Sequence, residues 1–411
     1  MKIHIIVGKN YGDEGKGLAV DYFAERAKSR GERALVIRHN GGAQAGHTVD
    51  RPAGRFIFHQ LSSGSFAGAD TFWADTFLPD LYKVEEERQD FRGQFGLVPD
   101  ILAQGNCRLV LIDDVLLNMA AETARGKHRH GSCGMGINEA VNRCENPEFA
   151  LLLKEFVGQS AEESASLMGR IRREYLPMRL QKIRLSLSEA GEYGELLRDD
   201  GILLAVSEQM HRAAERIRLV DLGGQNFDFS PYGEILFEGA QGLLLDNDCR
   251  EFYPYTTPSK TGCHNPVAFC RNYLPEEAPE MVYVTRSYVT RHGAGPLPCE
   301  ITDEGFRGSI KDATNIPNDW QGTLRFAKHP DMEAFVKYME ADLADADIPH
   351  TRSLFVTHLN ETGHKMLLED GEVPVEEFLE KLRGRWPFSK SYLSDSKYGQ
   401  DVRETGWESG V

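Results

Sequence analysis

The sequence predicts an α/β protein with a central, mostly parallel sheet that is flanked by helices and interrupted by a helical insert. Three observations predict this class. Apolar runs with strand character alternate with amphipathic stretches over residues 1–145, as in a parallel sheet. Glycine-rich loops at 12–17 and 40–47 each follow such a run. After a helical stretch at 150–222, the strand pattern resumes near residue 235.

The first glycine loop, Gly-Asp-Glu-Gly-Lys-Gly at 12–17, stands between an apolar run at 3–7 and an amphipathic stretch at 18–30. This order predicts strand, loop and helix. Backbone N–H groups and the positive end of a helix dipole make such a loop an anion site. Asp13 and Lys16 add a carboxylate and an ammonium group. Phosphate chemistry uses both, a cation for the phosphoryl oxygens and an acid group for a metal or a proton.

This loop differs from the common phosphate-binding pattern Gly-x-x-x-x-Gly-Lys-Ser/Thr at two positions. Asn10 stands where the first glycine belongs, and Gly17 replaces the hydroxyl residue that would hold magnesium. Asp13 is therefore the nearest candidate for a metal ligand. A lone glycine loop can be a structural turn. The second loop, Asn-Gly-Gly-Ala-Gln-Ala-Gly-His at 40–47, also follows a strand-like run, at 34–37, and favours a ligand site.

Composition restricts the classes of function. The chain has 411 residues, 41% apolar and 27% charged, a globular composition that is long enough for one large core over 1–411 or for two to three structural units. A net charge of −16 argues against nucleic acid or an anionic membrane as a partner. Seven scattered cysteines without Cys-x-x-Cys spacing indicate reduced thiols in a cytoplasmic protein. The N-terminal apolar run is too short for a signal peptide, and no stretch approaches a membrane span.

The stretch at 150–222 carries apolar side chains at helical spacing among many charges, which predicts a mostly helical subdomain. Its arginine-rich part is interpreted as a solvated face rather than as a phosphate site. The arginines concerned are Arg170, Arg172, Arg173, Arg179 and Arg184.

Further strands are expected at 109–112, 235–237, 281–284 and 354–356, and a helix at 115–123. Short loops rich in Gly, Pro and Thr follow the later strands. An open α/β sheet collects its ligand site at the carboxyl ends of its strands, so we expect the site there.

Five segments form an ordered set. They are GDEGKG (12–17), NGGAQAGHTV (40–49), RHGSCGMGI (129–137), FEGAQGLLLDND (237–248) with FYPYTT (252–257), and TRHGAGPLP (290–298). As a set, they resemble the adenylosuccinate synthetase family, and smaller matches at 58–64 and 124–127 agree. The resemblance runs to about residue 300, interrupted by the helical region. It implies a P-loop-NTPase-like fold.

The resemblance also implies a ligase that forms a carbon–nitrogen bond, with Mg²⁺ as cofactor. Such enzymes phosphorylate the 6-oxo group of a purine nucleoside monophosphate with the γ-phosphate of a nucleoside triphosphate, GTP or ATP. L-Aspartate then displaces the phosphate and leaves a succinylated 6-amino purine. The order is chemically reasonable, because a purine lactam oxygen is a poor leaving group until it is phosphorylated.

Residue by residue, Asp13 matches the base that takes the proton of ring nitrogen 1, and also a magnesium ligand. His47 matches the acid over the 6-oxygen, a role that suits imidazole near neutral pH. The carbonyl of Gly46 would complete the metal shell. The resemblance assigns the triphosphate to Lys16 and to the amides of Gly12, Gly15 and Gly17.

For the monophosphate, Gln241 corresponds to the glutamine that touches the purine, and Thr257 to a hydroxyl on the 5′-phosphate. Ser132 lies on the phosphate loop. Arg143 matches an arginine that crosses a dimer interface to the partner's nucleotide phosphate, which implies a homodimer.

Two departures fall in the phosphate pocket. The family's usual Asn in the second loop is Gln44, and the second Thr of the third loop is Cys133. Gln adds a methylene, and a thiol is a weak donor, so the nucleotide pose is expected to shift.

The largest departure is the aspartate loop, where the family carries Thr-Thr-Gly-Arg-x-Arg-Arg. Gly322 and Arg325 remain, and Thr323 replaces the first arginine. Arg325 can still pair with a substrate carboxylate. The lost arginine leaves open a deoxynucleotide, a different amino donor, or its relocation to Arg307 or Arg352.

A further departure is Asn360, where the family has an aspartate that recognises guanine. Asparagine offers a donor and an acceptor, which fits adenine, so ATP or dATP can replace GTP. Gly399, in Gly-Gln-Asp at 399–401, resembles the family's final loop around that base. Residues 301–411 are thus expected to form a divergent region for the aspartate loop and the nucleotide base.

Two alternatives stay open. One is a 2-aminoadenylosuccinate synthetase that uses dGMP with ATP or dATP, as in a phage branch of the family; that branch tends to alter the position of Asp13, which argues against a simple assignment. The other is a non-catalytic purine nucleotide sensor on the same fold, motivated by Gln44, Cys133 and Thr323. A plain P-loop kinase or ATPase is disfavoured by Gly17 and by the additional loop that ends in His47.

Overall fold

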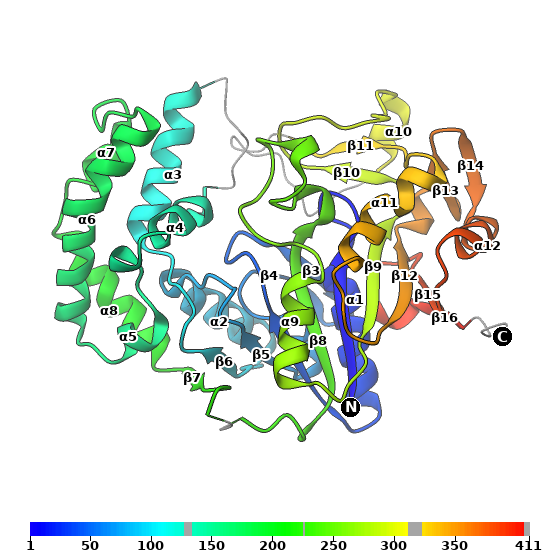
Figure 1. Ribbon diagram of the computed structural model, residues 1–411, viewed down its shortest axis with the longest axis horizontal. Coiled ribbons are helices and arrows are strands. Elements are labelled where there is room, and N and C mark those ends of the chain that lie inside the picture. The colour runs from blue at the N-terminus through cyan, green and yellow to red at the C-terminus, as the bar shows by residue number, and fades with distance from the viewer. Residues whose placement is uncertain (127–133, 225–226, 311–322, 407–411) are drawn as a thin grey trace.

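A ten-stranded sheet forms the centre of the computed structural model, which describes residues 1–126, 134–224, 227–310 and 323–406 (Figure 1). The strand order is β16-β15-β12-β9-β1-β8-β2-β5-β6-β7. Neighbouring strands are parallel except for the antiparallel pair β15–β16. The strands are β1 (Lys2–Gly8), β2 (Arg33–Arg38), β5 (Asp70–Trp73), β6 (Ile101–Gln104), β7 (Ile217–Val220), β8 (Tyr232–Gly242), β9 (Glu280–Arg286), β12 (Thr351–Thr357), β15 (Lys390–Leu393) and β16 (Arg403–Gly406). The predicted fold class is confirmed.

Helices cover both faces of this sheet. Val36 of β2 packs in one core cluster with side chains of α1 (Lys16–Ser29). The next residue, Ile37, packs in another cluster with helices from later in the chain. Those helices are α9 (His264–Tyr273), α11 (Met332–Leu343) and α12 (Val375–Arg385). Because both faces are buried, the strands read as continuous apolar runs in the sequence.

Helices α3 to α8 form a lobe beside the sheet, at the left of Figure 1. These helices are α3 (Ile112–Arg125), α4 (Ile137–Cys144), α5 (Leu153–Val157), α6 (Ala161–Ile183), α7 (Gly191–Leu196) and α8 (Ile202–Ala214). Helix α2 (Leu81–Phe95) packs against α8. The stretch expected to be mostly helical, 150–222, contains α5 to α8 and ends in strand β7 at the edge of the main sheet.

The interpretation of the arginine-rich part as a solvated face is wrong for two residues. Arg172 is buried and pairs with Asp113 at 2.6 Å, and Arg179 is buried and pairs with Glu139 at 2.6 Å. These pairs tie α6 to α3 and α4. The other three arginines of the set are exposed.

The strand expected at 109–112 is also wrong. Residues 109–111 are buried and Ile112 begins α3, while the backbone N–H of Leu109 donates to Leu151 and that of Val110 donates to Pro79. The segment therefore connects β6 to α3 and adds no strand to the sheet. The other strand expectations fall within β1, β2, β8, β9 and β12.

Smaller ribbons stand at the carboxyl edge of the sheet. They are β3 (His47–Arg51) with β4 (Gly54–Phe58), β10 (Val289–Arg291) with β11 (Arg325–Ala327), and β13 (Lys365–Leu368) with β14 (Gly371–Pro374); the short α10 (Glu304–Ser309) precedes β11. Within the described ranges, no helix is long and apolar enough to cross a membrane.

Candidate active site

The first glycine loop joins the end of β1 to α1 and turns sharply. Gly12, Asp13 and Gly15 have φ angles of 102°, 61° and 97°, in the left-handed region that glycine adopts easily and aspartate tolerates. Glu14 holds the turn: its carboxylate accepts the N–H groups of Asn10 at 2.9 Å and Gly12 at 2.8 Å.

Lys16 lies at the first position of α1, where its ammonium pairs with Glu14 at 2.9 Å, and both side chains are buried. The loop therefore places the ammonium group of Lys16 at the N-terminus of α1, where the helix dipole also favours the binding of an anion. Glu14 was missed by the sequence interpretation, although it stands inside the motif that was singled out.

Gly17 explains why the magnesium-binding hydroxyl of the common pattern is absent. A Cβ atom at this position would lie 3.0 Å from the carbonyl oxygen of Thr48 and 3.2 Å from the Cβ of His47. The first turn of α1 thus packs directly on β3, and serine or threonine at this position would require these neighbours to shift. The same packing brings the two glycine loops together.

His47 begins β3, and its imidazole Nδ1 lies 2.5 Å from a carboxylate oxygen of Glu238, within β8. Burial lowers the pKa of His47, although the charge of Glu238 opposes this. Burial works against ionisation of Glu238, but His47, Arg38 and Ser63 outweigh it and hold the pKa of Glu238 at about 2. Glu238 was also missed; its signal was a carboxylate that ends a strand-like apolar run, 235–237.

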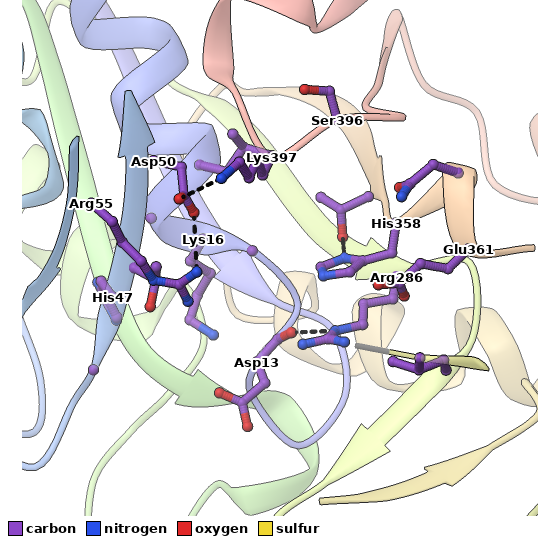
Figure 2. A pocket seen from close by; sticks show the side chains of 18 residues that line it. Asp13, Lys16, His47, Asp50, Arg55, Arg286, His358, Glu361, Ser396 and Lys397 are labelled. Carbon is purple, nitrogen blue, oxygen red and sulfur yellow. Dashed lines mark hydrogen bonds and ion pairs between the residues drawn. The ribbon is translucent and has the colours of Figure 1, made fainter. Parts of the chain in front are cut away.

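Two cavities, of about 460 and 560 Å³, meet at the two glycine loops. Asp13, Lys16, Gly46 and His47 line both of them. Figure 2 shows the amine of Lys16 between Asp13 and His47. The structure therefore brings the acid, the amine and the imidazole of the sequence prediction to one shared boundary.

The first cavity contains most of the residues assigned to the triphosphate. Gly15 and Gly17 line it together with Asn360. Gly12 lines the second cavity instead. Gly399 lines neither cavity; it packs on α1, where a Cβ atom would lie 2.9 Å from Asp21.

The wall of the first cavity near Gly399 comes from the preceding residues Ser396 and Lys397. Lys397 pairs with Asp50 at 3.2 Å, and Arg55 pairs with the same carboxylate at 3.6 Å (Figure 2). Both cations were missed by the sequence interpretation, since nothing in the sequence connects the chain's last loop with β3.

The second cavity contains Gln44, Gln241 and Thr257, three of the residues assigned to the monophosphate. Gln241 has a φ of 66°, and the turn that presents it is held because Asn40 exchanges two hydrogen bonds with the backbone of Ala240, at 2.8 and 3.1 Å. Within the described residues, both amide atoms of Gln44 and the amide oxygen of Gln241 are buried without a hydrogen-bond partner. Unpaired buried amides of this kind are available to a polar ligand.

Three assigned residues, Ser132, Cys133 and Gly322, lie outside the described residues. Arg143, assigned to the partner's nucleotide, is anchored within its own chain. Its guanidinium is 1% exposed, forms two-pronged contacts with Asp114, and donates to the carbonyls of Leu109 and Phe149 at 2.7 and 2.6 Å. All three nitrogens are engaged within its own chain.

The residues assigned to aspartate also lie differently from the expectation. In the described part of the chain, neither Thr323 nor Arg325 lines one of the two cavities. Arg325 pairs with Glu300 through two contacts, at 2.9 and 2.5 Å, and donates to the carbonyl of Gly295 at 2.8 Å. Its charge is already neutralised by a protein carboxylate.

The expected Mg²⁺ fits the residues at the boundary of the cavities. Among the described residues, no group of three His, Cys, Asp or Glu side chains forms a metal site, so the protein alone would not hold a metal in a closed cage. Mg²⁺ is commonly bound by one or two carboxylates together with substrate phosphates. Asp13, whose carboxylate has no hydrogen-bond or ion-pair partner in the described ranges, and the backbone of Gly46 suit such an open site.

A glycine loop, a buried lysine at a helix N-terminus and two joined cavities at the carboxyl edge of a parallel sheet define a nucleotide-binding α/β protein. Residues 5–316 match the family model of adenylosuccinate synthetase. The adenylosuccinate synthetase of Pseudomonas fluorescens (strain SBW25) is 31% identical over 320 residues, and that of Pseudomonas paraeruginosa (strain DSM 24068 / PA7) is 30% identical over 313. The chain belongs to the adenylosuccinate synthetase family, whose members are carbon–nitrogen ligases.

These sequence matches cover 73% of this chain but only 66% and 65% of the two relatives, just under two thirds of their length. Two solved structures share the fold. The fully ligated adenylosuccinate synthetase of Plasmodium falciparum gives a TM-score of 0.72 at 15% identity and covers 98% of this chain and 99% of that one. Cyanophage S-2L succinoaminodeoxyadenylate synthetase, bound to dGMP and dATP, gives 0.63 at 17% identity and covers 98% and 95%.

Proposed function

We propose that this chain is a purine nucleotide–aspartate ligase. It would phosphorylate the 6-oxo group of a nucleoside monophosphate such as IMP and replace that phosphate by L-aspartate. The observation that carries the proposal is the shared boundary of the two cavities, where Asp13, Lys16 and His47 meet. A phosphoryl donor in the first cavity and an acceptor in the second would touch there.

Each group at this boundary has a role in the reaction. Asp13 takes the proton of ring nitrogen 1, so that negative charge builds on the 6-oxygen. That oxygen attacks the γ-phosphorus, and the bond to the nucleoside diphosphate breaks. Lys16 and the N–H groups of Gly15 and Gly17 stabilise charge on the phosphoryl oxygens, and most of the acceleration comes from this positioning.

His47 lies beside the 6-oxygen and the transferred phosphoryl group. In the second step, the amino group of aspartate attacks carbon 6 and inorganic phosphate leaves with the oxygen. A proton donor at that oxygen lowers the barrier to departure. A bound Mg²⁺, held by Asp13 and the carbonyl of Gly46, would supply positive charge to the phosphates.

The phosphoryl donor is proposed to be ATP or dATP rather than GTP, because Asn360 lines the first cavity at the position where the family recognises guanine with a carboxylate. A second acceptor, dGMP, stays a candidate: Gln44 alters the phosphate pocket, and Thr323 replaces an arginine near the ribose. The sensor hypothesis predicts tight nucleotide binding without turnover.

A reducing, cytoplasmic setting is part of the proposal and is supported by the described cysteines, all of which are free thiols. A homodimer stays a prediction, but Arg143 no longer supports it, since that side chain is anchored within its own chain. Light scattering at several protein concentrations would test the oligomeric state.

The decisive experiment crosses IMP, dIMP, GMP and dGMP with ATP, dATP and GTP in the presence of Mg²⁺ and aspartate, and reads product mass. A succinylated purine nucleotide supports the ligase, and the productive pair names the substrates. A His47→Ala variant, prepared in parallel, should lose turnover by about 10²–10⁴-fold. Binding of nucleotides with no product from any combination would favour the sensor.

A further inference from the structure

Glu238 is a fully buried carboxylate beside the candidate active site. Its side chain has no exposed surface, and it stands within β8, in the centre of the sheet. One oxygen lies 2.5 Å from Nδ1 of His47, and the carboxylate also accepts the hydroxyl and the backbone N–H of Ser63. The guanidinium Nε of Arg38 lies 3.8 Å away. A buried charge with this many partners is held in one place.

The contact decides which nitrogen of His47 faces the substrate. An ionised carboxylate can only accept, so Nδ1 carries the proton and donates it to Glu238. Nε2 is then the nitrogen left for the boundary of the two cavities, which His47 lines on both sides. Histidine tautomers are commonly fixed in this way, by the hydrogen bond of the other ring nitrogen.

The contact between His47 and Glu238 also connects two sheets that share no backbone pairing within the described residues. His47 stands on the β3–β4 ribbon, which is a separate two-stranded sheet, whereas Glu238 stands on the central strand β8. On its other side, the Cβ of His47 faces Gly17, where a further carbon would come within 3.2 Å. The imidazole is therefore held between the first turn of α1 and the carboxylate of Glu238.

We propose that Glu238 is a positioning residue that aims Nε2 of His47 at the 6-oxygen of the purine and the transferred phosphoryl group. It acts through His47 and touches neither substrate. The inference rests on the proposed ligase function, and it adds a residue on which the orientation of the acid depends. Removing Glu238 should leave both cavities in place while the imidazole loses its fixed orientation.

The test combines Glu238→Gln with a matched control on the same strand. Glu234 is also a buried carboxylate of β8, and it also contacts a histidine, His4, at 2.8 Å, but at the opposite edge of the sheet. Glu238→Gln should lower kcat by about 10–100-fold, the usual effect of removing an orienting partner, with KM values for nucleotides and aspartate within about threefold of wild type. Glu234→Gln removes an equal charge and should keep kcat within about threefold.

Nitrogen NMR of histidine-labelled protein reads the orientation without requiring turnover. In the wild type, the signals of His47, assigned by their loss in a His47→Gln variant, should report a proton on Nδ1, and Glu238→Gln should give a mixture of tautomers. Glu238→Asp, which keeps the charge but shortens the reach, should recover part of kcat. Thermal unfolding of each variant shows which of them fold.

The outcomes separate this inference from the proposed function. If the wild type makes no product from any substrate pair, the ligase proposal fails while the NMR signature still tests the role of Glu238. The inference is overturned by an Nδ1 without a proton in wild-type His47, by unchanged kcat in Glu238→Gln, or by equal losses of kcat in Glu238→Gln and Glu234→Gln.

Discussion

The two parts of the chain on either side of residue 300 position their predicted site residues very differently. Before residue 300, Asp13, Lys16, His47 and Gln241 all line a cavity, although Gln241 is more than 190 residues from the other three in sequence. After residue 300, Asn360 alone among the described predicted residues does so. The sheet fixes the positions of short glycine loops that follow directly on its strands. The long side chain of an arginine on a peripheral ribbon can instead pair with a nearby protein carboxylate.

The clearest example is Arg325, which stands opposite Arg291 in the β10–β11 ribbon. Its bidentate geometry is suited to a substrate carboxylate, yet Glu300 from the same neighbourhood already occupies it. A motif match fixes the identity of a side chain but does not fix its partner. The comparison predicts that substitutions near the glycine loops have the largest effects.

The largest effect is expected from Asp13→Asn, which keeps the shape of the side chain but removes its charge and basicity. We expect kcat to fall by about 10²–10⁴-fold, because the proton on ring nitrogen 1 loses its acceptor. Steady-state rates with the productive substrate pair measure this. Asp50→Asn, in the wall of the first cavity, is the comparison variant and should cost less. Equal losses would mean that the boundary of the two cavities is not the reaction centre.

A second prediction concerns the opposite edge of the sheet in the same region. His4 on β1 lies 2.8 Å from Glu234 and 3.1 Å from Glu280, and its ring stacks on Phe23 at 4.0 Å. Burial would lower the pKa of His4, but contacts with the two carboxylates outweigh it and raise that pKa. Burial would raise the pKa of Glu280, but His4, Ser353 and Tyr392 hold it at about 2.

Because folding raises the pKa of His4, protonated His4 stabilises the fold fully below pH 6.5. This stabilisation is lost as the pH rises through the pKa of His4 in the folded state. The lowered pKa of Glu280 contributes above 4.5 and is lost as pH falls towards 2. His4→Gln should therefore lower the free energy of unfolding by about 3–5 kcal/mol near pH 6, and by clearly less at pH 9. Urea unfolding at both pH values measures it; equal losses would contradict the ionic account.

Sequence reasoning located the site because glycine motifs at strand ends constrain the backbone. It missed partners that only the fold creates. Glu14 and Glu238 stood within recognised motifs, but their contacts with Lys16 and His47 depend on loop curvature and on the meeting of β3 with β8. The contacts of Arg143 were missed because its partner, Asp114, lies 29 residues earlier on another helix. The apolar segment at 109–112 resembles a strand, and only its backbone partners distinguish it from one.

A third prediction tests the one predicted residue after position 300 that lines a cavity. Asn360→Asp replaces a donor and an acceptor by two acceptors, which suits guanine rather than adenine. The ratio of kcat/KM for GTP to that for ATP should rise by about tenfold or more, equivalent to about 1.4 kcal/mol. Asn360→Ala is the control, and it should weaken both donors without reversing their order. An unchanged ratio would mean that Asn360 does not contact the base.

The smallest expected effect comes from Glu300→Gln, which tests whether Arg325 binds the substrate aspartate. If Arg325 binds the substrate aspartate, its ion pair with Glu300 must first break. This pair is partly exposed, and it contributes about 0.2–1 kcal/mol. Removing the carboxylate should then lower the KM for aspartate by about two- to fivefold at constant kcat. Glu372→Gln, which breaks the exposed pair with Lys365 on the β13–β14 ribbon, is the matched control and should change nothing. If Glu300→Gln and Arg325→Ala both leave the KM for aspartate unchanged, Arg325 is a structural residue, and the amino donor is held by residues that the family motif does not identify.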